Sequence, residues 1–83
     1  MLAYYDSFYG LVPVKVKRVI KEGARWEIEA IVTANRKWGG YKRGTRIIAS
    51  QLYIVPRTTI KRTKYNTYIL PYDAAEEYKE FLK

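Results

Sequence analysis

The chain has 83 residues and contains neither cysteine nor histidine, which excludes disulfides, thiolate metal sites and the usual imidazole base. This length fits one domain, which we expect to span residues 1–83, and a hydrophobic content of 48% is enough for a small core. Sixteen basic and eight acidic residues give a net charge of +8. No run approaches the ~20 apolar residues of a membrane helix, and no targeting segment is recognised, so we expect a cytoplasmic protein without a membrane partner.

The positive charge is concentrated in the middle of the sequence. Residues 30–72 contain no Asp or Glu, whereas the two ends together are close to neutral. The basic residues of this acid-free stretch are Arg36, Lys37, Lys42, Arg43, Arg46, Arg57, Lys61, Arg62 and Lys64. A solvated surface usually mixes both signs, and a region of one sign repels itself until a polyanion neutralises it. The distribution therefore predicts a polyanionic partner.

The first part of the chain has the pattern of β-strands. Residues 1–10 are rich in aromatic side chains and predict a short strand or an arm packed on the body. Within residues 11–20, the valines from Val12 to Val16 alternate with Pro13 and lysines, which is the period of a half-buried strand. The alternation slips afterwards, which predicts a bulge near Lys17 and Arg18. Residues 21–23 are expected to form a turn.

The next segments predict three more strands and one long loop. Residues 25–33 alternate most clearly, and they place Trp26 on the same face as Ile28, Ala30 and Val32, in the core. Residues 35–44 form a glycine-containing loop, NRKWGGYKRG. Strands follow at residues 45–49 and 52–55, joined by a tight turn at residues 50–51, and Pro56 interrupts the pattern.

The last part predicts a hairpin and a helix. Residues 58–62 and 65–70 are expected to pair around Thr63 and Lys64. A helix over residues 73–82 should begin at Asp73 as the N-cap, and Glu76 stands where it would complete a capping box. Its apolar face would consist of Ala74, Ala75, Tyr78, Phe81 and Leu82. We expect this acidic helix to lie across one end of the sheet, away from the basic surface.

Together these elements predict a mainly β fold with one C-terminal helix: a small antiparallel barrel or strongly bent sheet of five to six strands over residues 11–70. The pattern from Val12 to Arg57 resembles an SH3-like barrel. A small basic barrel with a terminal helix is similar to the chromatin proteins of hyperthermophilic archaea, which implies DNA binding. The richness in Ile, Tyr, Lys and Arg without Cys or His also suits a thermophile.

Two segments are candidates for contact with nucleic acid. In the loop, Arg36, Lys37, Lys42 and Arg43 are suited to phosphates, while Trp38 and Tyr41 are suited to stacking or wedging between bases. The alternative is an ordinary hairpin whose tryptophan folds back on the barrel. Residues 57–68 supply Arg57, Lys61, Arg62 and Lys64 with threonine hydroxyls, and the alternative there is an edge hairpin protected by charge. Arg46 completes the set.

The sequence argues against an enzyme. It has no cluster of metal ligands, no nucleotide-binding glycine motif and no cofactor motif, and its only serines are Ser7 and Ser50. We therefore expect a nucleic-acid-binding protein, for DNA or RNA, with mainly electrostatic phosphate contacts and low sequence specificity. A protein-interaction module with an acidic partner, or a small subunit of a ribonucleoprotein or viral assembly, is the alternative. A small basic ribonuclease that uses Lys, Arg and Tyr is a third possibility.

Overall fold

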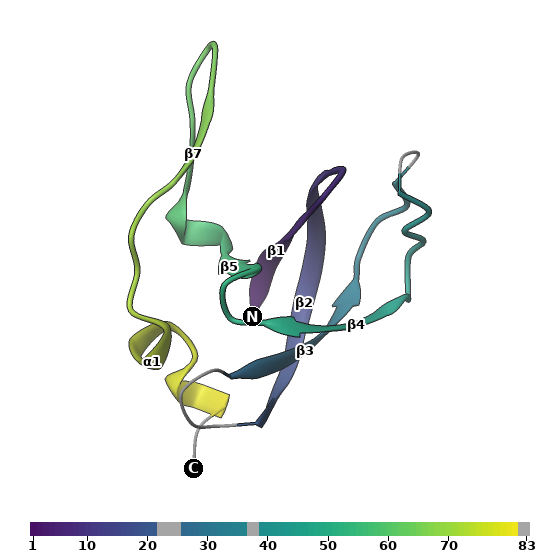
Figure 1. Cartoon of the computed structure of the whole chain (residues 1–83), viewed down its shortest axis with the longest axis vertical. Helices are drawn as coiled ribbons and strands as arrows, with labels where there is room; N and C mark the ends of the chain where they lie inside the picture. Colours follow the sequence, from purple (N-terminus) through teal and green to yellow (C-terminus); the bar gives the residue numbers. More distant parts are fainter. Residues whose placement is uncertain (22–25, 37–38, 82–83) are drawn as a thin grey trace.

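The computed structural model describes residues 1–21, 26–36 and 39–81, and over these ranges the protein is mainly β (Figure 1). The first five strands are β1 (Leu2–Ser7), β2 (Gly10–Lys21), β3 (Glu27–Val32), β4 (Arg46–Ser50) and β5 (Ile54–Pro56). A 3-10 turn, η1 (Arg57–Thr59), leads to β6 (Ile60–Arg62) and β7 (Thr67–Ile69). The chain then forms α1 (Ala74–Glu77) and a second 3-10 turn, η2 (Lys79–Phe81).

Five strands make one antiparallel sheet in the order β4-β3-β2-β1-β5, and β6 and β7 make a separate two-stranded sheet. This confirms the predicted mainly β fold with an antiparallel sheet. Within the described ranges the sheet is open, with β4 at one edge and β5 at the other. The register between β2 and β3 shifts between Val16 and Arg18, as the slipped alternation predicted.

The hydrophobic core lies on one face of the bent sheet. Val12, Val14 and Val16 point into it from β2, and the pairing of β2 with β3 places Ala30 and Val32 beside them. Because side chains alternate along a strand, the residues between these valines lie on the opposite face, here called the outer face. Trp26, which was expected in the core, is only partly buried and packs against its edge.

Several predicted boundaries change in the structure. Pro56 belongs to β5 instead of interrupting it, and it pairs with Ala3, so the strand predicted at residues 52–55 begins later. The turn of the β6–β7 hairpin spans residues 63–66, where the Thr63 hydroxyl accepts from the Asn66 N–H at 3.1 Å. The turn predicted at residues 21–23 falls largely outside the described residues.

The predicted helix is much shorter than the sequence suggested. Asp73 does cap it, since its carboxylate accepts from the N–H of Ala75 at 3.0 Å. Glu76 accepts from the Lys79 ammonium at 2.9 Å, and regular α-helix ends at Glu77. Ala75, expected on the apolar face, is exposed, and Leu82 lies outside the described residues.

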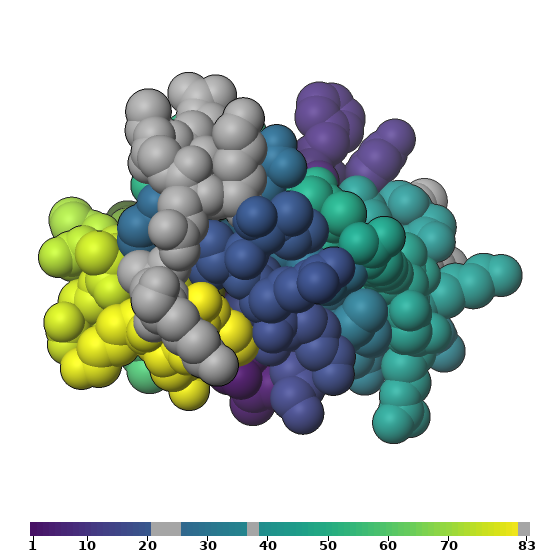
Figure 2. Space-filling model, turned by 90° about the horizontal axis from the view of Figure 1, so that it is seen from below, coloured from purple at the N-terminus to yellow at the C-terminus, as the bar shows by residue number. Residues whose placement is uncertain are grey.

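Tyr78 anchors this C-terminal segment to the sheet. Its side chain is fully buried, and its phenol donates a 2.7 Å hydrogen bond to the carbonyl of Ile54 in β5. Seen from below, the C-terminal segment (yellow) and the region around β4 (teal) lie at opposite sides of the molecule (Figure 2). None of the helices described is long and apolar enough to cross a membrane.

Candidate nucleic-acid interface

The outer face of the sheet collects basic side chains from distant parts of the sequence. Lys15 and Lys17 of β2 line a cavity of about 220 Å³ together with Arg43, which belongs to the loop before β4, and Ile31 forms part of its wall. Both lysines and Arg43 are exposed. The loop is held in place by its own hydrogen bonds, because the Arg43 N–H donates to the Asn35 side-chain oxygen at 2.8 Å. A negatively charged group in this cavity would meet three cations.

A carboxylate lies between two further cations of the outer face. Glu29 of β3 accepts a hydrogen bond from Arg18 at 2.7 Å through one oxygen and from Arg46 through the other. The Arg46 guanidinium, with that of Arg18, holds the pKa of Glu29 below its usual range despite partial burial. Arg46 was expected to contact phosphate, but the structure pairs it with Glu29, which reduces the charge it offers to a partner.

A larger cavity, of about 530 Å³, lies where the sheet, the loop and the second hairpin meet. Asp6 and Leu11, which are paired across β1 and β2, form one part of its lining. Arg36 contributes from the loop and Arg62 from β6, so two candidate residues that are far apart in sequence share one cavity. Thr67 and Ile69 of β7 complete the lining. Because Asp6 is also part of the lining, the cavity carries one negative charge beside the two positive charges of the arginines.

Two of the predicted arginines lie over the ring of Tyr4 in β1. The guanidinium carbon of Arg57 lies 5.5 Å from the centre of the Tyr4 ring, and that of Arg62 lies 5.9 Å from it. Such cation–π contacts orient a guanidinium without neutralising it. Arg57, however, also lines a cavity with Glu77 and Glu80 of the C-terminal segment. The acidic helix is therefore close to one of the basic candidates, contrary to expectation, and Arg57 is a weaker candidate than Arg62.

The remaining candidates differ in their surroundings. Lys42 and Lys61 are exposed, and Lys64 lies over the Tyr65 ring, 5.5 Å from its centre, at the tip of the hairpin. Tyr41 was expected to stack on bases, but it is half-buried and packs edge-on against Tyr5 at 5.8 Å. Burial and its contact with Tyr5 raise the pKa of Tyr41. The packing of Tyr41 against Tyr5 therefore explains the position of its ring without a base stacked on it. Lys37 and Trp38 lie outside the described residues.

Comparisons with known proteins leave the site to be interpreted from its own geometry. No family model, curated protein or solved structure matches the chain significantly. Across the described ranges, no group of three or more acidic side chains is placed to hold a metal ion.

The structure adds basic residues that the sequence analysis did not select. Lys15, Lys17 and Arg18 were counted with the nearly neutral ends of the chain, yet they share the outer face with residues of the acid-free middle. The alternation of β2 already placed Lys15 opposite the buried valines, and that signal could have identified it. We call the combined set the basic face; it consists of Lys15, Lys17, Arg18, Arg36, Arg43, Arg46 and Arg62.

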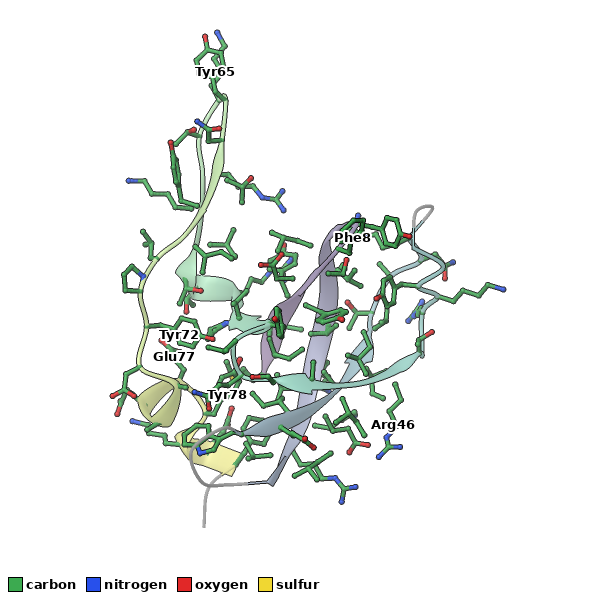
Figure 3. The ribbon with its side chains drawn as sticks, in the orientation of Figure 1. Phe8, Arg46, Tyr65, Tyr72, Glu77 and Tyr78 are labelled. Carbon is green, nitrogen blue, oxygen red and sulfur yellow. The ribbon has the colours of Figure 1, made fainter. Side chains whose placement is uncertain are left out.

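The structure exposes aromatic rings at two hairpin tips. Phe8, in the turn between β1 and β2, has 96% of its surface exposed, and Tyr65, in the turn between β6 and β7, has 81%. Figure 3 shows both side chains at the ends of their hairpins, pointing away from the core. From the sequence, the aromatic residues of positions 1–10 were expected mainly to pack on the body of the protein. Rings this exposed contribute little to the core.

Proposed function

We propose that the protein binds nucleic acid through the basic face, mainly by contacts between its cations and phosphates. The observation that carries the proposal is the convergence of Lys15, Lys17 and Arg43, from two separate segments, around one cavity of the outer face. Lys and Arg are the side chains that neutralise phosphates, and neutralisation supplies most of the affinity of non-specific binding. Half-buried Ile31 and exposed Ile48 nearby offer apolar contact to sugars and bases.

Low sequence specificity fits this arrangement. Base readout in duplex DNA commonly uses a helix in the major groove. The short α1 carries Glu76 and Glu77 and no basic residue, so it is unsuited to a groove lined by phosphates. The contacts available on the basic face are suited to backbone phosphates, which carry no sequence information.

We also propose that the open sheet is a variant of the SH3-like barrel. The return of β5 to pair with β1 supports this, because it brings the last strand of the five back beside the first. The similarity to small archaeal chromatin proteins depends on the same point and on the C-terminal segment that packs against the core.

The decisive experiment is a titration of the protein with duplex DNA, single-stranded DNA and structured RNA at several salt concentrations. If about five cations of the basic face contact phosphates, the logarithm of the binding constant should fall with the logarithm of salt concentration with a slope of about −4 to −5 on duplex DNA. Absence of binding to all three at low salt would eliminate the proposal.

A protein-interaction module is the second candidate, and one observation favours it. A cavity of about 590 Å³ between the β4–β5 turn and the segment that leads to α1 is lined largely by apolar side chains, including Leu52, Ile69 and Leu70. Each of these three is more than two-fifths exposed. If the function is protein binding, Leu52→Asp should abolish capture of the partner while nucleic-acid affinity, if any, stays unchanged.

A further inference from the structure

The β1–β2 turn lies between two segments that carry basic residues. The loop that carries Arg36 lies on one side of it and the hairpin that carries Arg62 lies on the other (Figure 1). Both arginines line the cavity of about 530 Å³ that Asp6 and Leu11, the residues flanking this turn, help to form. The exposed ring of Phe8 lies at the tip of this hairpin, close to the Asp6–Leu11 pair that helps to line the cavity, although Phe8 itself is not part of the lining.

The turn is well held, so the exposure of Phe8 is not the result of a loose tip. The Ser7 hydroxyl donates to the Gly10 carbonyl at 2.6 Å and accepts from the Tyr9 N–H at 3.2 Å. The Tyr9 ring lies against the loop at Gly39. A Cβ atom added at Gly39 would be only 3.0 Å from this ring. Gly39 has a φ of +83°, so its backbone also favours glycine there. Tyr9 is anchored, whereas Phe8 faces solvent.

We propose that this region binds an unpaired nucleotide of a single strand: Phe8 stacks on the base, and Arg36 and Arg62 contact the phosphates on either side. The inference depends on the proposed nucleic-acid binding. Aromatic rings beside a basic groove are the usual recognition elements for single strands, since every base offers a face to stack on. The positive charges of the two arginines complement the negative charges of the phosphates.

The cavity is large enough for one nucleotide. A volume of about 530 Å³ falls within the range that accommodates a drug-sized ligand, which is the scale of a single nucleotide. Asp6, which lines the same cavity as the two arginines, repels a phosphate but accepts hydrogen bonds from a base amino group or a ribose hydroxyl. The carboxylate thus has a role in a nucleotide site that it would lack in a simple phosphate site.

The test uses oligonucleotides that carry the fluorescent base 2-aminopurine, as single strands and as the matching duplexes. In the wild-type protein, stacking should change the 2-aminopurine emission of the single strand on binding. Phe8→Ala should remove that change and weaken single-strand affinity by about tenfold, with little effect on the duplex. Tyr65→Ala, which removes an exposed ring from the other hairpin, is the matched control and should preserve the emission change.

The arginines provide a second measurement. Arg36→Ala and Arg62→Ala should each make the single-strand salt dependence shallower by about 0.7, whereas Phe8→Ala should leave it unchanged, because it removes no phosphate contact. Melting temperature checks that each variant is folded. An unchanged emission response in Phe8→Ala, with salt-dependent binding intact, overturns the nucleotide site and leaves the proposed function standing. An equal loss on single strand and duplex also overturns it. Failure of the wild-type protein to bind any nucleic acid overturns both proposals.

Discussion

The Tyr78 phenol donates a 2.7 Å hydrogen bond to the carbonyl of Ile54, and this bond joins the C-terminal segment to the last strand of the main sheet. The Tyr72 hydroxyl lies 2.7 Å from the Gln51 carbonyl oxygen and 3.2 Å from the Ile54 carbonyl oxygen, so its single proton is donated to Gln51 or shared between the two. Burial raises the pKa of both phenols, so they remain protonated donors across the ordinary pH range. Figure 3 shows Tyr72 and Tyr78 on the same side of the molecule, beside α1.

Removal of the Tyr78 ring should destabilise the protein more than removal of its hydroxyl. Tyr78→Phe deletes one hydrogen bond but leaves the Tyr72 hydroxyl 3.2 Å from the Ile54 carbonyl oxygen, so we expect a loss of about 1 kcal/mol in the free energy of unfolding. Tyr78→Ala also removes a large buried side chain and should cost about 3–5 kcal/mol. Denaturant unfolding measures both. Equal losses from the two variants would show that the ring does not pack in the core.

Asp73→Ala should reduce stability modestly. The Asp73 carboxylate accepts from the Ala75 N–H and satisfies one of the donors at the start of α1. Loss of an N-cap costs about 1 kcal/mol, and an Asp73→Asn variant, which keeps an accepting oxygen, should retain most of that stability. Thermal unfolding of both variants is the measurement. A full effect in Asp73→Asn would attribute the loss to charge instead of capping.

Glu29→Gln should change stability in a pH-dependent manner. The Arg46 and Arg18 contacts lower the pKa of Glu29 in the folded state, so its ion pairs stabilise the protein above the unfolded pKa of about 4.3. That contribution is lost as pH falls through the lowered folded pKa. The melting temperatures of wild type and variant should therefore converge in acid and separate up to about pH 5. A constant separation at all pH values would contradict this linkage.

The same substitution should strengthen nucleic-acid binding, if the basic face is the interface. Without the Glu29 carboxylate, Arg18 and Arg46 become available to phosphates. The slope of the salt dependence on duplex DNA should then steepen by up to about 2, with higher affinity at low salt. Glu80→Gln is a matched control on the C-terminal segment and should leave the slope unchanged. A parallel increase in both variants would mean that only net charge matters.

Charge reversal on the outer face should be more harmful than the same reversal elsewhere. Lys15→Glu removes one of the cations that line the cavity with Arg43, so affinity for all sequences should fall and the salt slope should become shallower. Lys79→Glu makes the same change in net charge at a residue that already pairs with Glu76, and its effect should be small. Equal losses from the two variants would argue against a defined interface.

The contact of Trp38 with nucleic acid stays a prediction from the sequence, because Trp38 lies outside the described residues. If it contacts nucleic acid, Trp38→Ala should weaken binding by about 1–3 kcal/mol with the salt slope and the melting temperature unchanged. If it packs on the sheet, the variant should instead lose about 3–5 kcal/mol of stability with unchanged affinity. Both quantities must be measured on the same variant. A variant that loses neither would favour the protein-interaction module.

The local features of this protein can be identified from its sequence alone. Alternating valines from Val12 to Val16 identify β2 and its buried face, and the slip after Val16 identifies the bulge, because strand geometry has a period of two residues. Asp73 marks the start of α1, since its short side chain suits an N-cap. The acid-free middle and its basic residues are also visible without any coordinates.

Only the tertiary structure decided which of these features meet. An alternation with a period of two residues indicates which side chains share a face of a strand, but not which strands pair. The pairing of β5 with β1 depends on contacts between residues about fifty positions apart. The fold brings Lys15 to Arg43 and Arg62 to Arg36, pairs Arg46 with Glu29, packs half-buried Tyr41 against Tyr5 and leaves Phe8 exposed. Charge and burial depend on distance in space, and sequence separation does not measure that distance.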